Sequence, residues 1–508
     1  DLLSRLERYN TIIIHLLGTS RRASREYGVG EGTVRLLERV APGATVILHM
    51  AGYPDAFARF GDLDQTDALV ISYLDHPLYR DLAVQGIFGG ISFSGRLPAR
   101  AGSVAPAGGG FTTGPPSRLG YGEPFDVGLD PDTLLRMEEI IREAIRKKAI
   151  PGCQVLVARK GKVVWHRAYG HHTYQNRRPV GTDDIYDLAS VTKITATLPS
   201  LMYLRDQGRF HEDSLLGAYG VVSDSCNKRD LLISDMLTHQ AGLVSWIPFY
   251  YATLETLDTS QSLISNRWTH IHPLMIGPGT YVNRNVKYMD SIYSRTYAPD
   301  YPVQVAEDLY IREGFRDSIY RTIEDSNVGR RTYLYSDLGF YLMQRVVENV
   351  TDTLLYPYAW HHFYGPLGAG TLGYLPLNRF PKERIVPTEN DMFYRRQLLQ
   401  GHVHDMGAAM LGGISGHAGL FGNSGDLAKM MQMYLNGGVY GDRRFIDSAT
   451  LVLYTSCFNC GGGNRRGLGF DRPVTDEPDA GPACDEASPV SYGHTGFTGT
   501  MAWVDPAY

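Results

Sequence analysis

The sequence of 508 residues has few cysteines, no long hydrophobic run and no large excess of either charge. Forty-nine basic and 54 acidic residues give a net charge of −5 without a polybasic run, so we expect neither nucleic acid nor an anionic membrane as a partner. The longest early apolar run, 11–17, is much shorter than the roughly 18 to 20 residues that span a bilayer, so no transmembrane segment is expected. The hydrophobic content of 43% is ample for large cores, and the length predicts about two to four domains.

The scarcity of cysteine also argues against a metal centre. The five cysteines are Cys153, Cys226, Cys457, Cys460 and Cys484. Cys457-x-x-Cys460 has no second pair of ligands to complete a zinc site, so neither a metal nor a cofactor is expected. For the last three cysteines the sequence leaves two readings open: a disulfide formed in an oxidising compartment, or unpaired small residues.

Among what is present, the stretch 187–202 is the strongest candidate for chemistry. Its apolar residues recur at helical spacing: Leu188, Ile194, Leu198 and Leu201. Ser190 and Lys193, three residues apart, would therefore share one helix face. A serine hydroxyl becomes a strong nucleophile when a neighbour takes its proton, and a lysine can do so if burial lowers its pKa. Backbone N–H groups at the start of the helix would stabilise an oxyanion.

Ser-x-x-Lys alone is a weak signal, because roughly one or two matches are expected by chance in a chain of this length. A second match, from Ser225 to Lys228, lies in the polar run 223–230. Its composition is typical of a loop, and we interpret it as a solvated turn.

Two further triplets give the first match its weight. Tyr-Ser-Asp occurs at 335–337, and His-Thr-Gly occurs at 494–496 in a strand-like stretch after a glycine turn. This ordered set resembles the serine β-lactamase and penicillin-binding-protein superfamily, whose pattern is Ser-x-x-Lys, then Tyr-x-Asn or Ser-x-Asn, then Lys-Thr-Gly. The stretches 150–158, 235–243 and 416–421 resemble its class C-like branch, which includes esterases and D-amino peptidases.

The resemblance implies a role for each matching residue. Ser190 would be the acylated nucleophile and Lys193 its proton acceptor, while Tyr335 would relay a proton to the leaving group and later activate water. The backbone N–H groups of Ser190 and Phe497 would form the oxyanion hole. The remaining positions of the last triplet, Thr495 and Gly496, would contact the substrate.

Two positions depart from the family pattern. Asp337 replaces the usual Asn; if ionised, it accepts hydrogen bonds, cannot donate them, and favours the charged form of Lys193. His494 replaces a permanently charged lysine and would be largely neutral at pH 7 unless a nearby carboxylate raises its pKa. Both changes argue against an efficient β-lactamase and for an esterase or a peptidase acting on cell-wall fragments.

The predicted function is therefore a serine hydrolase that forms an acyl-enzyme with an ester, an amide or a cell-wall peptide. Its expected substrate is a small molecule or a peptidoglycan fragment, and the family implies a periplasmic or envelope-associated location. The alternative is a catalytically silent penicillin-binding-like module that binds peptidoglycan or supports a glycosidase.

The N-terminal part, 1–104, alternates helix and strand signals. Apolar strands are predicted at 11–17, 45–49 and 67–73, with helices at 32–40 and 78–88. This order predicts a small α/β sandwich with a parallel sheet covered on both faces. The run 89–98 and the preceding 73–78 resemble the C-terminal α/β domain of glycoside hydrolase family 3. The resemblance implies that the sandwich is incomplete and belongs to a fusion protein. The barrel of that protein would resemble a β-N-acetylhexosaminidase (a β-N-acetylglucosaminidase) and lies outside this sequence.

The remaining sequence divides into a Gly/Pro-rich linker at 105–125 and a β-lactamase-related domain at 126–508. We expect an antiparallel sheet flanked by helices, plus a helical subdomain. Asp130 is expected to cap a helix that extends through Lys148, followed by a hairpin pairing 155–158 with 163–166. Since this sequence opens at Asp1 without a signal peptide, and relatives continue into another strand and a helix, we expect a segment of a larger protein.

One long stretch, 243–330, is rich in aromatic residues and lies between the Ser-x-x-Lys motif and the Tyr-Ser-Asp triplet. It predicts either a lid or pocket wall, suited to sugar faces or peptide side chains, or a packed helical subdomain with core aromatics. The methionines of the helix predicted at 426–435 are expected to lie in the core.

Overall fold

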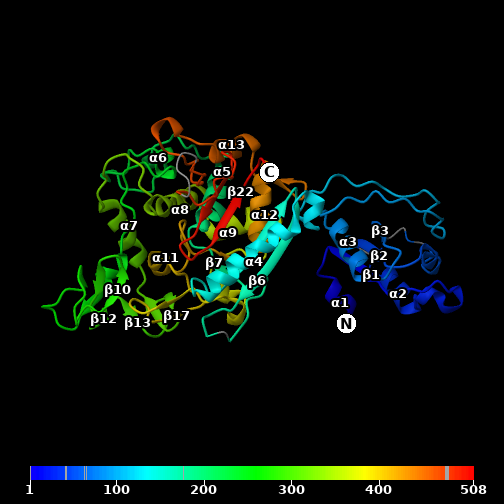
Figure 1. The fold of residues 1–508 in the computed structure, drawn as a ribbon, viewed down its shortest axis with the longest axis horizontal. Coiled ribbons are helices and arrows are strands. Elements are labelled where there is room, and N and C mark those ends of the chain that lie inside the picture. Colours follow the sequence, from blue (N-terminus) through cyan, green and yellow to red (C-terminus); the bar gives the residue numbers. More distant parts are fainter. Residues whose placement is uncertain (1, 41–42, 62, 64–65, 176, 475–479) are drawn as a thin grey trace. The chain divides into compact units, whose positions relative to one another are not determined.

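A computed structural model describes residues 2–40, 43–61, 63, 66–175, 177–474 and 480–508. The chain forms two compact units, one comprising Asp1–Val127 with Arg159–Val164 and the other comprising Gly128–Ala158 with Trp165–Tyr508 (Figure 1). Within the described ranges, no helix has both the length and the apolar character needed to cross a membrane.

The first unit is built around a parallel sheet of three strands in the order β1 (Thr11–Leu16), β2 (Thr45–Met50) and β3 (Ala68–Ile71). Its helices are α1 (Leu2–Leu6), α2 (Glu31–Val40) and α3 (Pro77–Ile87), with 3-10 turns at Ala23–Gly28 and Pro54–Arg59. The predicted strands and helices are confirmed, with ends that differ by one or two residues.

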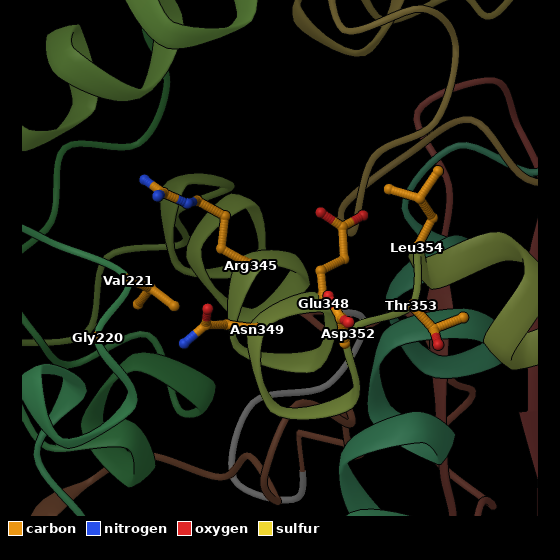
Figure 2. A pocket seen from close by; sticks show the side chains of 8 residues that line it. All are labelled: Gly220, Val221, Arg345, Glu348, Asn349, Asp352, Thr353 and Leu354. Atoms are coloured by element: carbon orange, nitrogen blue, oxygen red, sulfur yellow. The ribbon is translucent and has the colours of Figure 1, made fainter.

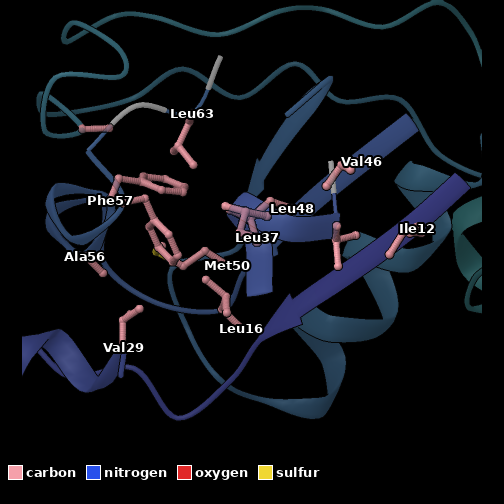
Figure 3. Packing of buried hydrophobic residues seen from close by; sticks show 13 residues of the cluster. Ile12, Leu16, Val29, Leu37, Val46, Leu48, Met50, Ala56, Phe57 and Leu63 are labelled. Carbon is pink, nitrogen blue, oxygen red and sulfur yellow. The ribbon is translucent and has the colours of Figure 1, made fainter. Parts of the chain in front are cut away.

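Figure 3 shows the core of this unit. Val46, Leu48 and Met50 of the central strand are fully buried, and Leu37 of α2 and Phe57 pack into the same cluster. A central parallel strand must bury both of its faces, which explains why Val46, Ile47 and Leu48 are apolar in succession instead of alternating with polar residues.

The Gly/Pro-rich segment is partly ordered. Residues 105–119 contain no helix or strand, but Gly108 N donates to Leu97 O and Thr113 N to Phe93 O. The end of the segment differs from the expected irregular linker, because β4 (Gly120–Tyr121) pairs in parallel with β6 (Lys162–Gly170). A 3-10 turn follows at Pro124–Val127.

The second unit begins as predicted. Asp130 Oδ1 accepts a hydrogen bond from Asp132 N at 3.0 Å and caps α4 (Pro131–Arg146). Next comes the hairpin of β5 (Gly152–Arg159) and β6, whose turn uses positive φ angles at Lys160 and Gly161. These cap and turn signals are local, which is why sequence alone locates them.

Buried helices form the core of the second unit. Every residue from 191 to 202 is buried, and this stretch contains a π-helical segment (Lys193–Thr197) followed by α5 (Leu198–Asp206). The other main helices are α6 (Ile233–Leu237), α8 (Leu338–Thr351), α9 (Leu355–Ala359), α11 (Met406–Met410), α12 (Ser424–Leu435) and α13 (Ser448–Thr455). In α12, Met430 and Met433 are fully buried, which confirms the core position expected for its methionines.

Two short antiparallel pairs of strands lie on either side of the Ser190 turn. In one, β7 (Tyr186–Asp187) pairs with β18 (Phe421–Gly422). In the other, β21 (Tyr492–Thr495) pairs with β22 (Met501–Val504), with His494 opposite Ala502. Together they place the residues before Ser190 close to the last triplet.

The regular structure of the aromatic stretch 243–330 is mainly short β strands, so its interpretation as a helical subdomain is wrong. Its strands are β8 (Leu254–Thr256), β9 (Ile264–Ser265), β10 (Leu274–Gly277), β11 (Thr280–Val282), β12 (Val286–Tyr288), β13 (Tyr293–Ser294), β14 (Val303–Ala306) and β15 (Leu309–Ile311), followed by α7 (Phe315–Asp325). Tyr250 and Tyr293 are buried, whereas Trp268 and Tyr297 are exposed. Strands of two to four residues are too short to show a clear alternation in sequence.

Candidate active site

Ser190 lies in a tight turn between β7 and the buried helix. Asp187 Oδ1 accepts a hydrogen bond from Ala189 N at 2.9 Å, and Ala189 has a φ of 44°. A left-handed conformation is costly for a residue with a Cβ and persists only where the surroundings enforce it. The turn thus holds Ser190 at the start of the helix, half-buried.

The side chains of Ser190, Lys193 and Asp337 meet in one hydrogen-bonded group. Lys193 Nζ donates to Ser190 Oγ at 2.9 Å and to Asp337 Oδ1 at 2.6 Å. The carbonyl oxygen of His417 accepts a third bond from the same amine at 3.3 Å. The lysine side chain is completely buried, and its three donors are therefore all used.

The electrostatics of this group favour a charged amine. Burial lowers the pKa of Lys193, but the charges and hydrogen bonds of Asp337 and Tyr335 outweigh burial and raise that pKa above its ordinary value. The sequence-based expectation that Asp337 favours the charged lysine agrees with this direction. In this state Lys193 is a hydrogen-bond donor to Ser190 rather than a base.

The triplet 335–337 is positioned by His239 and by the first residues of the aromatic stretch. Ser336 N donates to Nδ1 of His239 at 3.1 Å, and Ser336 Oγ donates to Val244 O at 2.7 Å. Asp337, directly before α8, donates its N–H to Ser245 O at 3.0 Å. These bonds fix the backbone on both sides of Ser336 and so orient its two neighbours toward Lys193.

Tyr335 forms one wall of the site. Its ring centroid is 5.1 Å from Lys193 Nζ and 4.5 Å from the ring of His239. Its hydroxyl is buried and has no hydrogen-bond partner of good geometry in the described part of the chain. The phenol ring thus lies near the amine, and its hydroxyl keeps donor and acceptor capacity that no described residue uses.

The segment that contains the last triplet is hydrogen-bonded to the Ser190 turn. Thr498 Oγ1 donates to Asp187 O at 2.7 Å, and Thr500 Oγ1 donates to Leu188 O at 3.0 Å. A Cβ at Gly496 would lie 2.1 Å from Thr500 Oγ1 and 2.7 Å from Leu188 O, so only glycine permits this approach.

Two backbone N–H groups point to an oxyanion hole. Neither the N–H of Ser190 nor that of Phe497 has an acceptor among the residues that the structure describes. The Phe497 side chain is 84% exposed, and Thr495 is exposed beside it. Unpaired backbone N–H groups near a nucleophile are the donors that a tetrahedral oxyanion requires.

His494 is buried and neutral. Its Nδ1 donates to Thr495 O at 2.6 Å, which leaves Nε2 as the unprotonated nitrogen, buried and without a partner within the described ranges. Burial, together with the positive charges of Arg466 and Lys193, holds the pKa of His494 well below its usual value. The histidine ring is 6.0 Å from the ring of Tyr335. The structure thus brings together Ser190, Lys193, Tyr335, Asp337, His494 and Gly496.

Residues 137–508 match the family described as Beta-lactamase. The chain belongs to the beta-lactamase family. Over 411 residues, it is 29% identical to a protein of Escherichia coli O157:H7 named "Putative D-alanyl-D-alanine carboxypeptidase", covering 75% of this chain and 82% of that one. It is also 29% identical over 400 residues to the "N-acetylmuramyl-L-alanine amidase" of Bacillus subtilis, covering 74% and 78%. A penicillin-binding protein homologue from Pyrococcus abyssi aligns with a TM-score of 0.48 at 16% identity, covering 74% and 71%.

Sequence reasoning missed Arg466 in this beta-lactamase-family site. Its side chain is almost fully buried, with its guanidinium carbon 5.3 Å from the centroid of the Tyr335 ring. The surrounding sequence, 465–471, signals only a loop that leads toward the last strand. No spacing rule links Arg466 to Tyr335, because the contact depends on how distant segments fold together.

Two histidine–carboxylate pairs lie next to residues of the family site. His417 Nε2 lies 2.9 Å from Asp405 Oδ1, and the His417 carbonyl accepts from Lys193. His404 Nε2 lies 3.0 Å from Glu389 Oε2, and its ring is 5.1 Å from that of Phe497. Burial lowers the pKa of His404, but the hydrogen bond and charge of Glu389 outweigh burial and raise that pKa.

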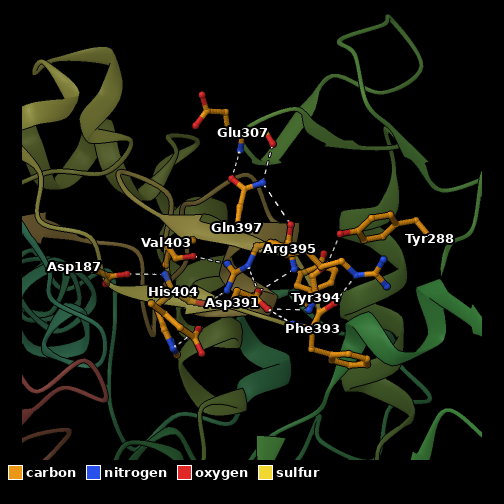
Figure 4. Close-up of polar contacts among 12 residues, drawn as sticks. Asp187, Tyr288, Glu307, Asp391, Phe393, Tyr394, Arg395, Gln397, Val403 and His404 are labelled. Atoms are coloured by element: carbon orange, nitrogen blue, oxygen red, sulfur yellow. Dashed lines mark hydrogen bonds and ion pairs between the residues drawn. The ribbon is translucent and has the colours of Figure 1, made fainter. Parts of the chain in front are cut away.

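A buried ion pair positions His404. The hairpin of β16 (Glu389–Asp391) and β17 (Gln397–Leu399) is tied together by Arg395, whose Nε donates to Asp391 Oδ2 at 2.8 Å. As Figure 4 shows, the same guanidinium reaches the carbonyls of Val403 and His404, both at 2.6 Å. His404 N donates to Asp187 Oδ2 at 2.6 Å, which links this hairpin to the Ser190 turn.

The second Ser-x-x-Lys match is indeed in a turn, but Lys228 is fully buried, which corrects the expectation of a solvated pair. Lys228 Nζ donates to the carbonyls of Glu324, at 3.1 Å, and Ser326, at 2.6 Å. Those carbonyls lie at the end of α7, where helix geometry leaves them unpaired. Ser225 is exposed.

Two of the cysteines are bonded to each other, and the described residues include one group of potential metal ligands. Cys457 and Cys460 form a disulfide, while Cys484 is exposed and unpaired. Among the described residues, a group of possible ligand atoms lies within 4.8 Å, provided by His211, Glu212 and Asp213. Glu212 is already paired with Arg205 at 2.9 Å, so this group offers no open carboxylate cluster.

A separate cavity of about 320 Å³ lies beside α8 (Figure 2). It is lined by Gly220, Val221, Arg345, Glu348, Asn349, Asp352, Thr353 and Leu354. None of these residues belongs to the site above, and the main polar groups are already bonded: Asn349 Nδ2 donates to Tyr219 O at 2.6 Å and Glu348 accepts from Gln344 at 2.9 Å.

Proposed function

We propose that this beta-lactamase-family protein is a serine hydrolase that forms an acyl-enzyme on Ser190. The observation that carries the proposal is the 2.9 Å bond from Lys193 Nζ to Ser190 Oγ beside two unpaired backbone N–H groups. Such a site supplies a positioned nucleophile and donors for the oxyanion, which are the two main requirements of acyl transfer.

The proposed reaction has two stages. Ser190 Oγ attacks the carbonyl carbon, its proton passes through Lys193 and Tyr335 to the leaving group, and the leaving group departs. Water then attacks the acyl-enzyme, one of its protons passes through Tyr335 and Lys193 to Ser190 Oγ, the bond from the acyl carbon to Oγ breaks, and the free acid leaves. Because Lys193 is charged in the resting site, it must lose a proton before it can accept the one from Ser190.

For the substrate, we propose an ester, an amide or a peptide from the cell wall. The names of two relatives, a D-alanyl-D-alanine carboxypeptidase and an N-acetylmuramyl-L-alanine amidase, support cell-wall chemistry. The neutral His494 lacks the permanent charge with which a lysine would hold a β-lactam carboxylate. A periplasmic or envelope location follows from such a substrate and is part of the proposal.

The first unit is proposed to be the C-terminal α/β domain of a glycoside hydrolase family 3 protein, with domains at 1–104 and 126–508 joined by 105–125. Its parallel sheet of three strands supports an α/β sandwich. The intact protein would then also be a β-N-acetylhexosaminidase. Chromogenic N-acetylglucosaminide hydrolysis by the complete polypeptide tests this, and Ser190→Ala must leave that activity unchanged.

The competing function is a silent module that binds peptidoglycan without acylation. The raised pKa of Lys193 favours it, because a protonated lysine cannot accept the proton of Ser190.

Labelling with a fluorophosphonate, read by intact mass, separates the two functions. We expect one adduct on the wild-type protein, none on Ser190→Ala, and normal labelling of Ser225→Ala. Ser225 is a matched control because it belongs to the other Ser-x-x-Lys sequence and is exposed. An unlabelled wild-type protein would overturn the hydrolase and support the silent module.

A further inference from the structure

We propose that Asp187 is the positioning residue of the oxyanion hole, because its carboxylate and its carbonyl hold the two segments that carry the N–H groups of Ser190 and Phe497. The inference deepens the proposed function, since it rests on acyl transfer at Ser190. Asp187 lies three residues before the nucleophile and belongs to none of the three motifs that the sequence identifies.

The first support is the use of the Asp187 carboxylate. Its Oδ1 accepts the N–H of Ala189 at 2.9 Å, so it holds the residue directly before Ser190. Its Oδ2 accepts the N–H of His404 at 2.6 Å, as Figure 4 shows, and so ties the same turn to a distant segment of the chain. A turn held at both oxygens resists rotation of the Ser190 N–H away from its present direction.

The second support is the contact with the other donor segment. Thr498 Oγ1 donates to the carbonyl oxygen of Asp187 at 2.7 Å, and Thr498 directly follows Phe497. Each of the two unpaired N–H groups therefore belongs to the immediate neighbour of a residue that Asp187 holds. Two donors stabilise an oxyanion well only when they keep their relative position, and a single residue bonded to both segments can set that position.

The third support is the cost of burying this carboxylate. Asp187 is 2% exposed. Both of its oxygens accept from backbone N–H groups, which carry no full charge, and burial raises the pKa of its carboxyl group. Burial of a carboxylate in this way costs stability. An asparagine would avoid that cost, but its single oxygen could replace only one of the two acceptors.

The role of Asp187 concerns the step in which negative charge develops on the substrate carbonyl oxygen. Asp187 is buried in the turn and acts through the N–H groups of Ser190 and Phe497. These donors are needed more in the transition state than in the bound substrate. Loosening them should therefore lower kcat and leave KM nearly unchanged.

The test compares Asp187→Asn with Asp184→Asn in the full chain. Asp184 is the matched control because it is also buried, at 5% exposed, and accepts a backbone N–H. Its Oδ2 lies 2.7 Å from Gly181 N and 2.7 Å from His172 Nε2, so the control removes a buried charge without changing the bonds of the Ser190 turn. Hydrolysis of p-nitrophenyl acetate gives kcat and KM. Inhibition by phenylboronic acid, which forms a tetrahedral adduct on serine, reports the oxyanion hole directly.

We expect Asp187→Asn to lower kcat by about 10- to 100-fold, to change KM by less than about threefold, and to raise Ki for the boronic acid as much as kcat/KM falls. Asp184→Asn should change each constant by less than about threefold, because it lies outside the contacts that hold the donors. Equal losses in the two variants, or a loss in KM alone, would overturn the assignment.

A milder variant decides the question if Asp187→Asn does not fold. Thr498→Val removes only the bond to the Asp187 carbonyl, and we expect it to lower kcat at least about fivefold. Thr351→Val is its control, since it removes a hydroxyl that donates to Val347 O at 2.8 Å at the end of α8. Wild-type kcat in Thr498→Val would show that Asp187 does not hold the Phe497 donor and would overturn the proposal.

Hydrogen exchange read by mass spectrometry separates this inference from the proposed function. If the wild-type protein takes no fluorophosphonate label, the hydrolase proposal fails, but exchange still tests the positioning role. In Asp187→Asn, the segments 187–192 and 494–500 should both exchange at least about fivefold faster, whereas Asp184→Asn should leave both as in the wild type. Unchanged exchange of 494–500 in Asp187→Asn would refute the role.

Discussion

Lys193 Nζ lies closer to Asp337 Oδ1, at 2.6 Å, than to Ser190 Oγ, at 2.9 Å. The lysine is buried, and the carboxylate is 19% exposed. The amine is therefore held mainly by a counterion and only secondarily by the nucleophile. This pairing determines the pH at which Lys193 can act as a base, because the charged amine must first lose a proton.

Asp337→Asn is expected to free Lys193 at lower pH. Removing the carboxylate removes the main influence that raises the pKa of Lys193, while burial continues to lower it. The acidic limb of the kcat/KM profile should move to lower pH by about one to three units. Ester hydrolysis measured across pH checks this. A limb that stays in place would mean that Lys193 is not the group whose deprotonation limits the rate.

Gly496→Ala is expected to disable the site. The new Cβ would lie 2.7 Å from the carbonyl oxygen of Leu188, so the Ser190 turn or the end of β21 must shift. A displacement of this kind costs at least about 100-fold in kcat/KM, and the overpacking costs about 1–3 kcal/mol of stability. Gly370→Ala is the control, since its Cβ would meet nothing within 4 Å. Wild-type kinetics in Gly496→Ala would contradict the close approach.

Arg395→Met is expected to destabilise the protein strongly. The substitution leaves Asp391 buried without its cation and removes the two bonds to the carbonyls of Val403 and His404. Breaking a buried pair from one side costs about 3–5 kcal/mol. Lys382→Met removes an exposed pair with Glu307 and should cost no more than about 1 kcal/mol. Urea denaturation of both variants measures their free energies of unfolding, and equal losses in the two variants would refute the prediction.

Glu389→Gln is expected to have a pH-dependent effect through His404. Because the folded state raises the pKa of His404, its pair with Glu389 stabilises the fold below the unfolded value near 6.5, and this stabilisation disappears as pH rises through the folded pKa. Glu389 is partly exposed, so the loss should not exceed about 1 kcal/mol near pH 6 and should be smaller near pH 9. Thermal unfolding at both pH values checks this. An equal loss of stability at both pH values would exclude the ion pair between Glu389 and His404 as the cause of that loss.

Cys460→Ser is expected to lower the stability of the protein modestly. The disulfide with Cys457 closes the loop that leads to Asn464, whose Oδ1 accepts from Arg466 N at 3.1 Å. Opening a loop this short costs about 2 kcal/mol at most. Urea denaturation measures this loss, and an unchanged free energy of unfolding would contradict it. Cys484→Ser, which removes an exposed unpaired thiol, should behave as wild type.

Local signals in the sequence were sufficient for many elements. The strands of the first unit, the cap at Asp130 and the buried helix after Ser190 all depend on neighbours within a few residues. Hydrophobic periodicity and helix-capping residues reflect such short-range preferences. The three triplets could also be placed in order, although their roles in this chain remain predictions until Ser190 is labelled.

Tertiary structure alone decided the surroundings of those triplets. Arg466 reaches Tyr335 although the two residues lie 131 positions apart in sequence, and Lys228 is buried because its amine meets carbonyls at the end of α7, far along the chain. The β structure of the aromatic stretch was likewise hidden, since its strands are short and stabilised by pairing. Amino-acid composition and hydrophobic periodicity describe the secondary structure that a segment prefers, given its neighbours in sequence. The charge at the candidate site depends instead on which distant side chains the fold buries together, and that information is carried by no single stretch of the chain.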